Sequence, residues 1–469
     1  MPISGTTSST SAISYVAQEV KSVPFFNSPL ASTASIMRDF GHATVAIRKC
    51  NEVTSANTGK FAHLQGNDFY VKNAGTRPFA SREVAAAEIY RLFASAPEVF
   101  LADNCNFFMD NADSKDVHIA SKVVDYQDFG DWMIRADSAD ALKKQCTDFS
   151  EDSFFAFKRN AKEAKELSAE LEKMRNENPG DWWKSGTNLF LPEEMRVPNQ
   201  ELVNRYRPKA FQLDDVMKKQ FLLLPEEYQK EMQEHLAVSQ LLGDWDPINA
   251  FYRNMGIVTE VTGAQHVMRL DFGSCLDVGF NYEPKEIGFK TATNQRPAVF
   301  PELVHVFMEK NAAFSEKLPK LAEELHHLPY ADYAKAITGK AEWAESTRMK
   351  IAYRCTLLKQ NVHNQNVIGD IIQRVVIDDG EVGPGLKTKE ALIDTMNARI
   401  DALINEQCGG SDQIYEWERQ NPGLSQAIRQ DLSSKSAIDM QPLNNALWTY
   451  PVSTGLGMTQ IHRSRDVFS

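Results

Sequence analysis

Three polar residues in the second half of the chain are spaced as phosphoryl-transfer chemistry requires. Asp244 and Asn249 stand five positions apart within LLGDWDPINAF, and Asp271 opens an Asp-Phe-Gly tripeptide further on. A phosphoryl-transfer site uses one carboxylate to orient the attacking hydroxyl, and an amide oxygen with a second carboxylate to hold magnesium. The order and spacing therefore indicate a magnesium-dependent site, with Asn249 and Asp271 as metal ligands.

The carboxylate that accepts the hydroxyl proton is ambiguous between Asp244 and Asp246. Asp244 stands five positions before Asn249, as in the catalytic loop of kinases, whereas the residue five after Asp246 is Phe251, which cannot bind metal. The register favours Asp244 and leaves Asp246 as the alternative.

A lysine upstream could neutralise phosphates. The segment HLQGNDFYVKNAG, residues 63–75, predicts two short strands around residues 66–68, and the second strand alternates and ends on Lys72. In kinases a strand lysine near the start of the fold contacts the α and β phosphates of ATP and is held by a glutamate on the next helix. Lys72 is therefore the candidate phosphate-binding residue.

The alanine-rich segment 81–93 predicts that helix, with Ser81 as a suitable N-cap. It offers two glutamates, Glu83 and Glu88, which stand roughly 140° apart around a helix, so only one can face the site. Glu88 lies on an apolar stripe of the helix, and on packing grounds this favours Glu88.

Taken together, these motifs resemble the atypical kinases. Lys72, EVAAAEIYRLF, HIASKVVDYQDF, LLGDWDPIN and LDFG follow one another in kinase order over residues 45–280. The resemblance is to the HipA-like and phosphoinositide-kinase-like groups and to the effector kinases that intracellular bacteria inject into host cells. It implies an α+β, bilobal, protein-kinase-like fold with a small β-rich N-lobe and a large, mostly helical C-lobe with insertions.

The resemblance also implies roles for particular residues. It transfers the lysine-pairing role to Glu83, in conflict with the packing argument, and both glutamates stay open. Ser121, Lys122 and Val123 would form the last N-lobe strand and the hinge, where adenine bonds to backbone groups. The implied cofactors are ATP and Mg²⁺.

The sequence departs from the usual kinase pattern in the glycine-rich loop and beside Lys72. No G-x-G-x-x-G precedes Lys72, and the loop at residues 51–61 offers Gly59 and small polar residues instead. Backbone N–H groups of such a loop can still bind phosphates. Tyr70 lies on the same strand face as Lys72, where a small residue would leave more room for adenine. A non-enzymatic pseudokinase scaffold and a kinase-fold adenylyl transferase are therefore alternatives to a kinase.

The predicted organisation has four parts. Residues 1–35 are rich in Ser and Thr and are expected to be flexible, 36–130 form the N-lobe, 131–408 form the C-lobe with a helical insertion near 137–225, and 409–469 form a tail. Within the insertion, apolar residues at helical spacing predict a long amphipathic helix over 151–176 with a core-facing stripe.

Composition narrows the function classes. The chain has 469 residues, a net charge of -12 and no sustained basic stripe, which argues against a nucleic-acid partner. It has no apolar run long enough to span a membrane and no secretory signal peptide. Six scattered cysteines fit a reducing cytosol. We therefore expect a cytoplasmic protein, or one secreted into a host cell with a host partner if it is an effector.

The acceptor would be a hydroxyl of a protein or of an inositol or phosphoinositide head group. Lys285, Lys290 and Arg296 follow the Asp-Phe-Gly in a chain that is acidic overall. In the phosphoinositide-kinase-like group, basic residues here meet head-group phosphates, so these three charges would attract an anionic substrate.

Overall fold

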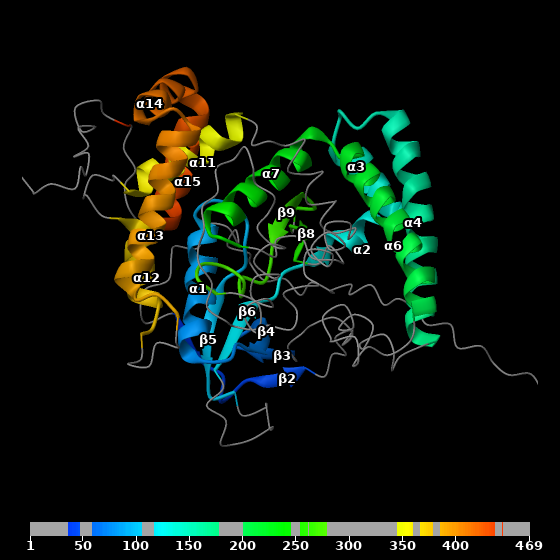
Figure 1. Ribbon diagram of the computed structural model, residues 1–469, viewed down its shortest axis with the longest axis horizontal. Coiled ribbons are helices and arrows are strands. Elements are labelled where there is room, and N and C mark those ends of the chain that lie inside the picture. Colours follow the sequence, from blue (N-terminus) through cyan, green and yellow to red (C-terminus); the bar gives the residue numbers. More distant parts are fainter. Residues whose placement is uncertain are drawn as a thin grey trace, which may run out of the picture.

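The protein has a mixed α+β architecture in a computed structural model (Figure 1). The structure describes residues 36–46, 59–105, 117–177, 200–244, 254–260, 262–278, 345–359, 366–378, 385–436 and 443. Asp246 and Asn249, the loop at 51–58, and the three basic residues after the Asp-Phe-Gly lie outside them.

A six-stranded sheet carries the lysine. Its order is β1-β5-β6-β4-β3-β2, and β4 is an inner strand that pairs antiparallel with both β3 and β6. The strands are β1 Met37–Asp39, β2 Thr44–Ala46, β3 Gly59–Leu64, β4 Asn67–Asn73, β5 Val99–Asp103 and β6 His118–Lys122. Because Lys72 lies near the end of an inner strand, neighbours on both sides fix its backbone.

The hairpin between β3 and β4 closes with a two-residue turn at Gln65 and Gly66. Both residues have positive φ, at 51° and 79°, as a type I′ turn requires. Leu64 pairs with Asn67, so the turn begins one residue ahead of the segment 66–68 around which the sequence placed it and shares Gly66 with that segment. This turn sets the β3–β4 register and with it the face from which Lys72 projects.

Helix α1, Arg77–Arg91, follows β4 directly and begins four residues earlier than the sequence predicts. Thr76 is its N-cap and Pro78 lies in the first turn, where the missing N–H of proline costs nothing. The prediction of Ser81 as N-cap is wrong: its hydroxyl donates to Pro78 O and accepts the N–H of Ile377. Ser81 therefore joins α1 to a distant part of the chain.

Helix α1 is buried on every side. It lies between the sheet and a group of C-terminal helices, with α12 its main helical neighbour (Figure 1). Its alanines have no long side chains and let neighbours approach from all directions. The C-terminal group is α11 Glu345–Lys359, α12 Val367–Val375, α13 Lys389–Ala402 continued by a π-helical turn at Leu403–Gln407, α14 Ser411–Gln420 and α15 Pro422–Ser436.

The part of the chain expected to be an irregular tail after residue 408 contains two helices. Ile414 on α14, and Ile428 and Leu432 on α15, are buried in the hydrophobic core that also contains α1 and α11. The helical region therefore continues past residue 408, to residue 436.

A second hydrophobic core lies among the helices formed by the middle of the chain, away from the C-terminal helices (Figure 1). It is formed by α2 Phe129–Met133, α3 Ala136–Gln145, α4 Glu151–Glu177, α6 Gln200–Leu223 and α7 Glu226–Leu241. The helix expected over 151–176 is α4. Its predicted stripe is buried throughout: Phe157, Ala161, Ala164, Leu167, Leu171 and Met174.

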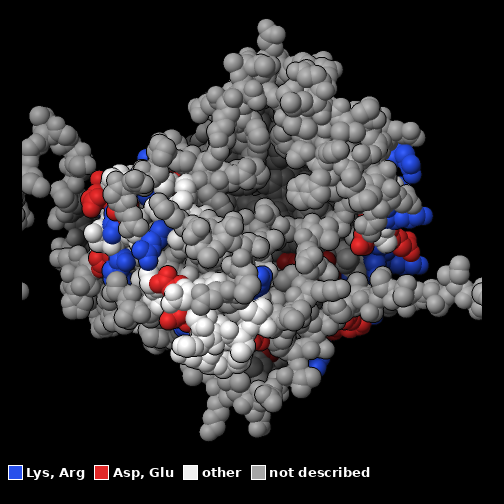
Figure 2. Space-filling model, turned by 90° about the horizontal axis from the view of Figure 1, so that it is seen from below, with Lys and Arg blue, Asp and Glu red and all other residues white. Residues whose placement is uncertain are grey.

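A three-stranded sheet packs on the second hydrophobic core and leads into the Asp-Phe-Gly. It consists of β7 Tyr126–Asp128, β8 Met255–Thr259 and β9 Gln265–Arg269, in the order β7-β8-β9. The β8–β9 hairpin falls between positions 249 and 271 of the sequence, and β9 ends just before Asp271. On the face shown in Figure 2, acidic and basic side chains of the described residues are interspersed. Among the described helices, none has the length and apolar character needed to cross a membrane.

Candidate functional site

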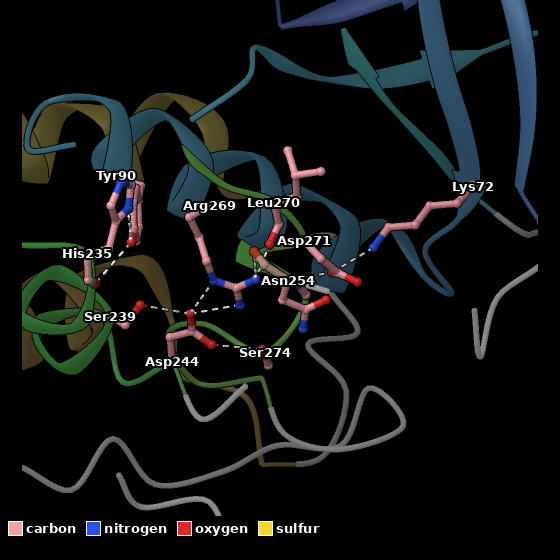
Figure 3. Close-up of polar contacts among 11 residues, drawn as sticks. Lys72, Tyr90, His235, Ser239, Asp244, Asn254, Arg269, Leu270, Asp271 and Ser274 are labelled. Carbon is pink, nitrogen blue, oxygen red and sulfur yellow. Dashed lines mark hydrogen bonds and ion pairs between the residues drawn. The ribbon is translucent and has the colours of Figure 1, made fainter. Parts of the chain in front are cut away.

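Three charged side chains from separate elements meet at one point. The Nζ of Lys72, on β4, lies 3.0 Å from Glu83 Oε1 on α1 and 2.8 Å from Asp271 Oδ1, just after β9. Figure 3 shows Lys72 extending from its strand toward Asp271. The inner strand, the buried helix and the hairpin therefore place one ammonium between two carboxylates.

Glu83, not Glu88, is the carboxylate beside Lys72. Glu88 Oε1 instead accepts a hydrogen bond of 2.9 Å from Arg91, one turn further along the same helix. The packing argument that favoured Glu88 fails because α1 is buried on all sides, so an apolar stripe does not define its inner face.

Glu83 is held in an environment that disfavours its charge. Burial raises the pKa of Glu83 to about 7, against a lowering by the Lys72 ammonium and a further raising by Asp271. Its Oε2 is buried and has no hydrogen-bond partner among the described residues. A Cβ at Gly273 would come within 3.0 Å of this oxygen, so the glycine of the Asp-Phe-Gly makes room for Glu83.

Asp271 stays ionised and accessible. Burial acts to raise its pKa, but the Lys72 ammonium outweighs it and lowers the pKa to about 2. Half of its side-chain surface is exposed, at 50%. Its φ of 59° lies in the left-handed region, which Asp tolerates better than most residues and which recurs at functional sites. Asp271 thus presents a permanent negative charge at an open position.

Asp244 has a different environment, because its carboxylate is fully enclosed. Oδ2 accepts from Arg269 Nε at 3.0 Å, from Arg269 Nη2 at 2.9 Å and from the Ser239 hydroxyl at 3.2 Å. Oδ1 accepts from the Ser274 hydroxyl at 3.0 Å. The side chains of Asp244 and Arg269 are both 0% exposed.

Arg269 bonds to three groups, the Asp244 carboxylate and two backbone carbonyls. Besides Asp244, its Nη1 donates to Asn254 O at 3.0 Å and to Leu270 O. Figure 3 shows the guanidinium between Asp244 and the backbone that leads into Asp271. Arg269 was not among the predicted site residues. Its signal was an arginine within the mostly apolar strand HVMRL, which can be buried only with a counter-charge.

His235 lies within the core behind the site and has a structural role. Burial lowers its pKa to about 3, so it is neutral. Its ring nitrogens lie 2.9 Å from Tyr90 Oη and 3.0 Å from Val267 O, and the Tyr90 ring packs on Phe272 of the Asp-Phe-Gly. His235 therefore links α7, α1 and β9.

The expected adenine-binding strand is β6 and the residue after it. Ser121 and Lys122 pair with β4, and Lys122 Nζ lies 3.6 Å from Glu98. The N–H of Val123 donates to Asp68 O at 2.8 Å, so adenine recognition through that N–H would have to displace this bond.

Gly59 has a packing role at the start of β3. A Cβ at this position would come within 2.1 Å of the Tyr70 ring, so the glycine allows Tyr70 to lie across the strand. This contact accounts for the glycine without phosphate binding.

Among the described residues, no three His, Cys, Asp or Glu side chains come together as a metal site. Magnesium does not require such a group, because it is commonly held by one or two carboxylates together with water and substrate phosphates. Asp271, ionised and half-exposed, suits that kind of ligation.

Comparison with known proteins adds a weak structural likeness. No protein-family profile and no curated protein sequence matches the chain. Among solved structures, the chain is similar to the crystal structure of a Helicobacter pylori proinflammatory kinase, CtkA, with 14% identity and a TM-score of 0.33, over 78% of this chain and 96% of that one. At this TM-score the likeness carries no inference, so the site residues are interpreted from their own geometry.

Proposed function

We propose that the protein is a phosphotransferase that uses ATP and Mg²⁺ in a kinase-like active site. The observation that carries the proposal is the contact of Lys72 with both Glu83 and Asp271, at 3.0 and 2.8 Å. A strand lysine held by a helix glutamate beside the Asp of an Asp-Phe-Gly is the arrangement with which kinases bind phosphates and metal. In this proposal the six-stranded sheet with α1 is the N-lobe and the later helices are the C-lobe.

Each of the three side chains has a defined task. Lys72 neutralises the α and β phosphates of ATP, and Glu83 holds the lysine in place. Asp271, with Asn249 as second ligand, holds the magnesium that offsets phosphate charge. The segment 244–249 supplies the carboxylate that positions the acceptor hydroxyl. Because a loose phosphoryl-transfer transition state needs little covalent help, positioning and charge neutralisation supply most of the rate.

The acceptor is a hydroxyl of a protein or of an inositol or phosphoinositide head group. The basic residues Lys285, Lys290 and Arg296 support an anionic acceptor, and they are the residues to reverse in charge once turnover is measured. We propose action in the cytoplasm, either of the producing cell or of a host cell.

Calorimetry of ATP binding tests the proposal. Wild-type protein should bind ATP only in the presence of magnesium, and Asp271→Asn should weaken this magnesium-dependent binding because it replaces the negatively charged metal ligand with a neutral one. Lys72→Met should weaken ATP binding with magnesium present. Glu418→Gln removes a buried carboxylate from a remote Arg429 pair and is the matched control.

Unchanged ATP affinity and unchanged magnesium dependence in Asp271→Asn would reject the assignment. ATP labelled at the γ or the α phosphate then identifies the reaction. Transfer of γ label defines a kinase, and transfer of α label defines adenylyl transfer. Binding without transfer to protein or phosphoinositide acceptors defines a pseudokinase scaffold.

A further inference from the structure

We propose that Asp244 and Arg269 form a buried positioning pair that holds Asp271 in its left-handed conformation, and that Asp244 does not accept the substrate proton. The inference rests on the proposed function, and it reverses the register argument that made Asp244 the proton acceptor. Its basis is the environment of Asp244 together with the other bonds of Arg269.

The first step concerns access to Asp244. A general base must come within hydrogen-bond reach of the proton that it removes. A carboxylate has about four acceptor positions. Two N–H groups of Arg269 and the hydroxyls of Ser239 and Ser274 donate to Asp244, and the side chain is 0% exposed. A substrate hydroxyl has no route to this carboxylate unless the network opens.

The second step concerns what the pair connects. Asp244 follows the end of α7, and its own N–H donates to Ser239 O, so the backbone here is anchored to that helix. Arg269 is the last residue of β9 and holds the carbonyls of Asn254 and Leu270. The guanidinium therefore ties the end of α7 to the start of β8 and to the residue just before Asp271.

The backbone of Asp271 is held in a strained conformation. Its φ of 59° is an unfavourable conformation for a residue with a Cβ, and such strain persists only where the surroundings impose it. Arg269 binds the Leu270 carbonyl on one side of Asp271, and on the other side the Ser274 hydroxyl donates to Asp244. In addition, the N–H of Leu276 donates to Leu242 O at 2.7 Å. Bonds to Arg269, Asp244 and Leu242 therefore hold the Asp-Phe-Gly at both ends.

The planar fork of arginine is what makes this pair possible. One guanidinium contacts a carboxylate and two carbonyls with geometry fixed by its plane, and a lysine ammonium would keep the charge but lose the fork. Arg269→Lys should therefore behave as a defective variant although it conserves charge. This distinguishes positioning from simple neutralisation of Asp244.

Hydrogen exchange without nucleotide tests the pair independently of catalysis. Asp244→Asn and Arg269→Lys should both raise exchange of amides in 270–276, and the double variant should be little worse than the poorer single variant, because both disrupt one unit. Glu418→Gln should leave exchange there unchanged. Unaltered exchange in Asp244→Asn would overturn the proposal, whatever the protein does with ATP.

Magnesium and pH provide the second readout. Loss of an outer-shell partner typically weakens metal binding about 10- to 100-fold, so both variants should need more magnesium to bind ATP. Asp244→Asn should keep the shape of the wild-type pH–rate profile at lower amplitude. Loss of turnover with unchanged magnesium requirement and loss of the acidic limb of that profile would identify Asp244 as the proton acceptor.

Variants of the serines are available if the charge variants do not fold. Ser239→Ala and Ser274→Ala each remove one neutral donor to Asp244 and keep the ion pair. In Ser274→Ala, hydrogen exchange at 270–276 should rise less than in Asp244→Asn, and turnover should be retained. Wild-type protein that fails to bind ATP would reject the proposed function, whereas the exchange data would still decide whether Arg269 and Asp244 position the Asp-Phe-Gly.

Discussion

At the scale of single residues, the charge of the site depends on pH near neutrality. Lys72 lies between two carboxylates whose pKa values are shifted in opposite directions. Burial raises the pKa of Glu83 to about 7, and Lys72 lowers that of Asp271 to about 2. Above pH 7 the group carries two negative charges and one positive charge, and below it only one of each. ATP would therefore meet a more neutral site at lower pH, and a lysine paired only with Asp271.

The raised pKa of Glu83 has a defined effect on stability. The folded value of about 7 exceeds the ordinary value of 4.5, so the native state binds more protons between these limits. The free energy of unfolding should then fall as pH rises across this window, by on the order of 3 kcal/mol. Glu83→Gln should abolish this part of the slope, as measured by urea unfolding at pH 5 and pH 8.

Glu88→Gln is the control for that measurement. It changes a second buried glutamate of the same helix, paired with Arg91 rather than Lys72. The slope should persist in this variant. If Glu83→Gln and wild type lose equal stability between pH 5 and pH 8, then Glu83 does not titrate in this range and its environment is more polar than the structure indicates.

At the scale of elements, helix α1 is fixed by bonds beside Glu83. Arg82 Nε donates to Asp277 Oδ1 at 2.8 Å, with both side chains 0% exposed, and Arg82 Nη2 donates to Lys387 O. Asp277 Oδ2 accepts the N–H of Lys387. The residue next to Glu83 is thus bonded both to the segment after the Asp-Phe-Gly and to the chain that leads into α13. The Lys72–Glu83 contact is held in place by these bonds.

Breaking this ion pair should be costly, whereas replacing it should not. Arg82→Met leaves the Asp277 charge buried without its partner and should lower the free energy of unfolding by about 3–5 kcal/mol. The double variant Arg82→Met/Asp277→Leu should recover most of the loss, because apolar replacement of a buried pair is often neutral. Denaturant unfolding of wild type, Arg82→Met, Asp277→Leu and the double variant measures this. A double variant as unstable as the sum of the two single changes would contradict it.

The sequence predicted the elements where local pattern decides them. The stripe of α4 and the hairpin before Lys72 follow from spacing and turn residues alone. The choice between Glu83 and Glu88 could not be predicted in this way, because a helix that is buried on all sides has no exposed polar face that would distinguish them. The partners of Arg82 and Arg269 were equally out of reach, since Asp277 stands 195 positions from Arg82 and periodicity says nothing about pairing at that distance.

At the scale of the whole molecule, the C-terminal helices complete the core around α1. Tyr353 on α11 bonds to Glu418 on α14, and Arg354 bonds both to Leu92 O at the end of α1 and to Asp431 on α15. The sequence missed this continuity because residues after 409 are polar on average. The buried apolar residues Ile414, Ile428 and Leu432 nevertheless place α14 and α15 in the core.

Removal of the residues after 408 should therefore unfold more than the removed part. The truncated chain would expose the apolar surface of α11 that α14 and α15 cover, and it would leave Arg354 without Asp431. We expect a large fall in melting temperature, or insoluble protein, together with loss of the Lys72 site. Ending the chain after residue 443 retains both helices and is the control. A stable, ATP-binding protein ending at residue 408 would show that the C-terminal helices are dispensable.

The bond between Arg82 and Asp277 also has a genetic consequence. A screen for loss-of-function substitutions should yield a group at residues 82, 277 and 386–388, in addition to a group at Lys72 and Asp271. Substitutions in the first group would resemble active-site defects because they release the helix that carries Glu83. Second-site suppressors of a weak Arg82 allele should map mainly to Asp277, almost two hundred codons away.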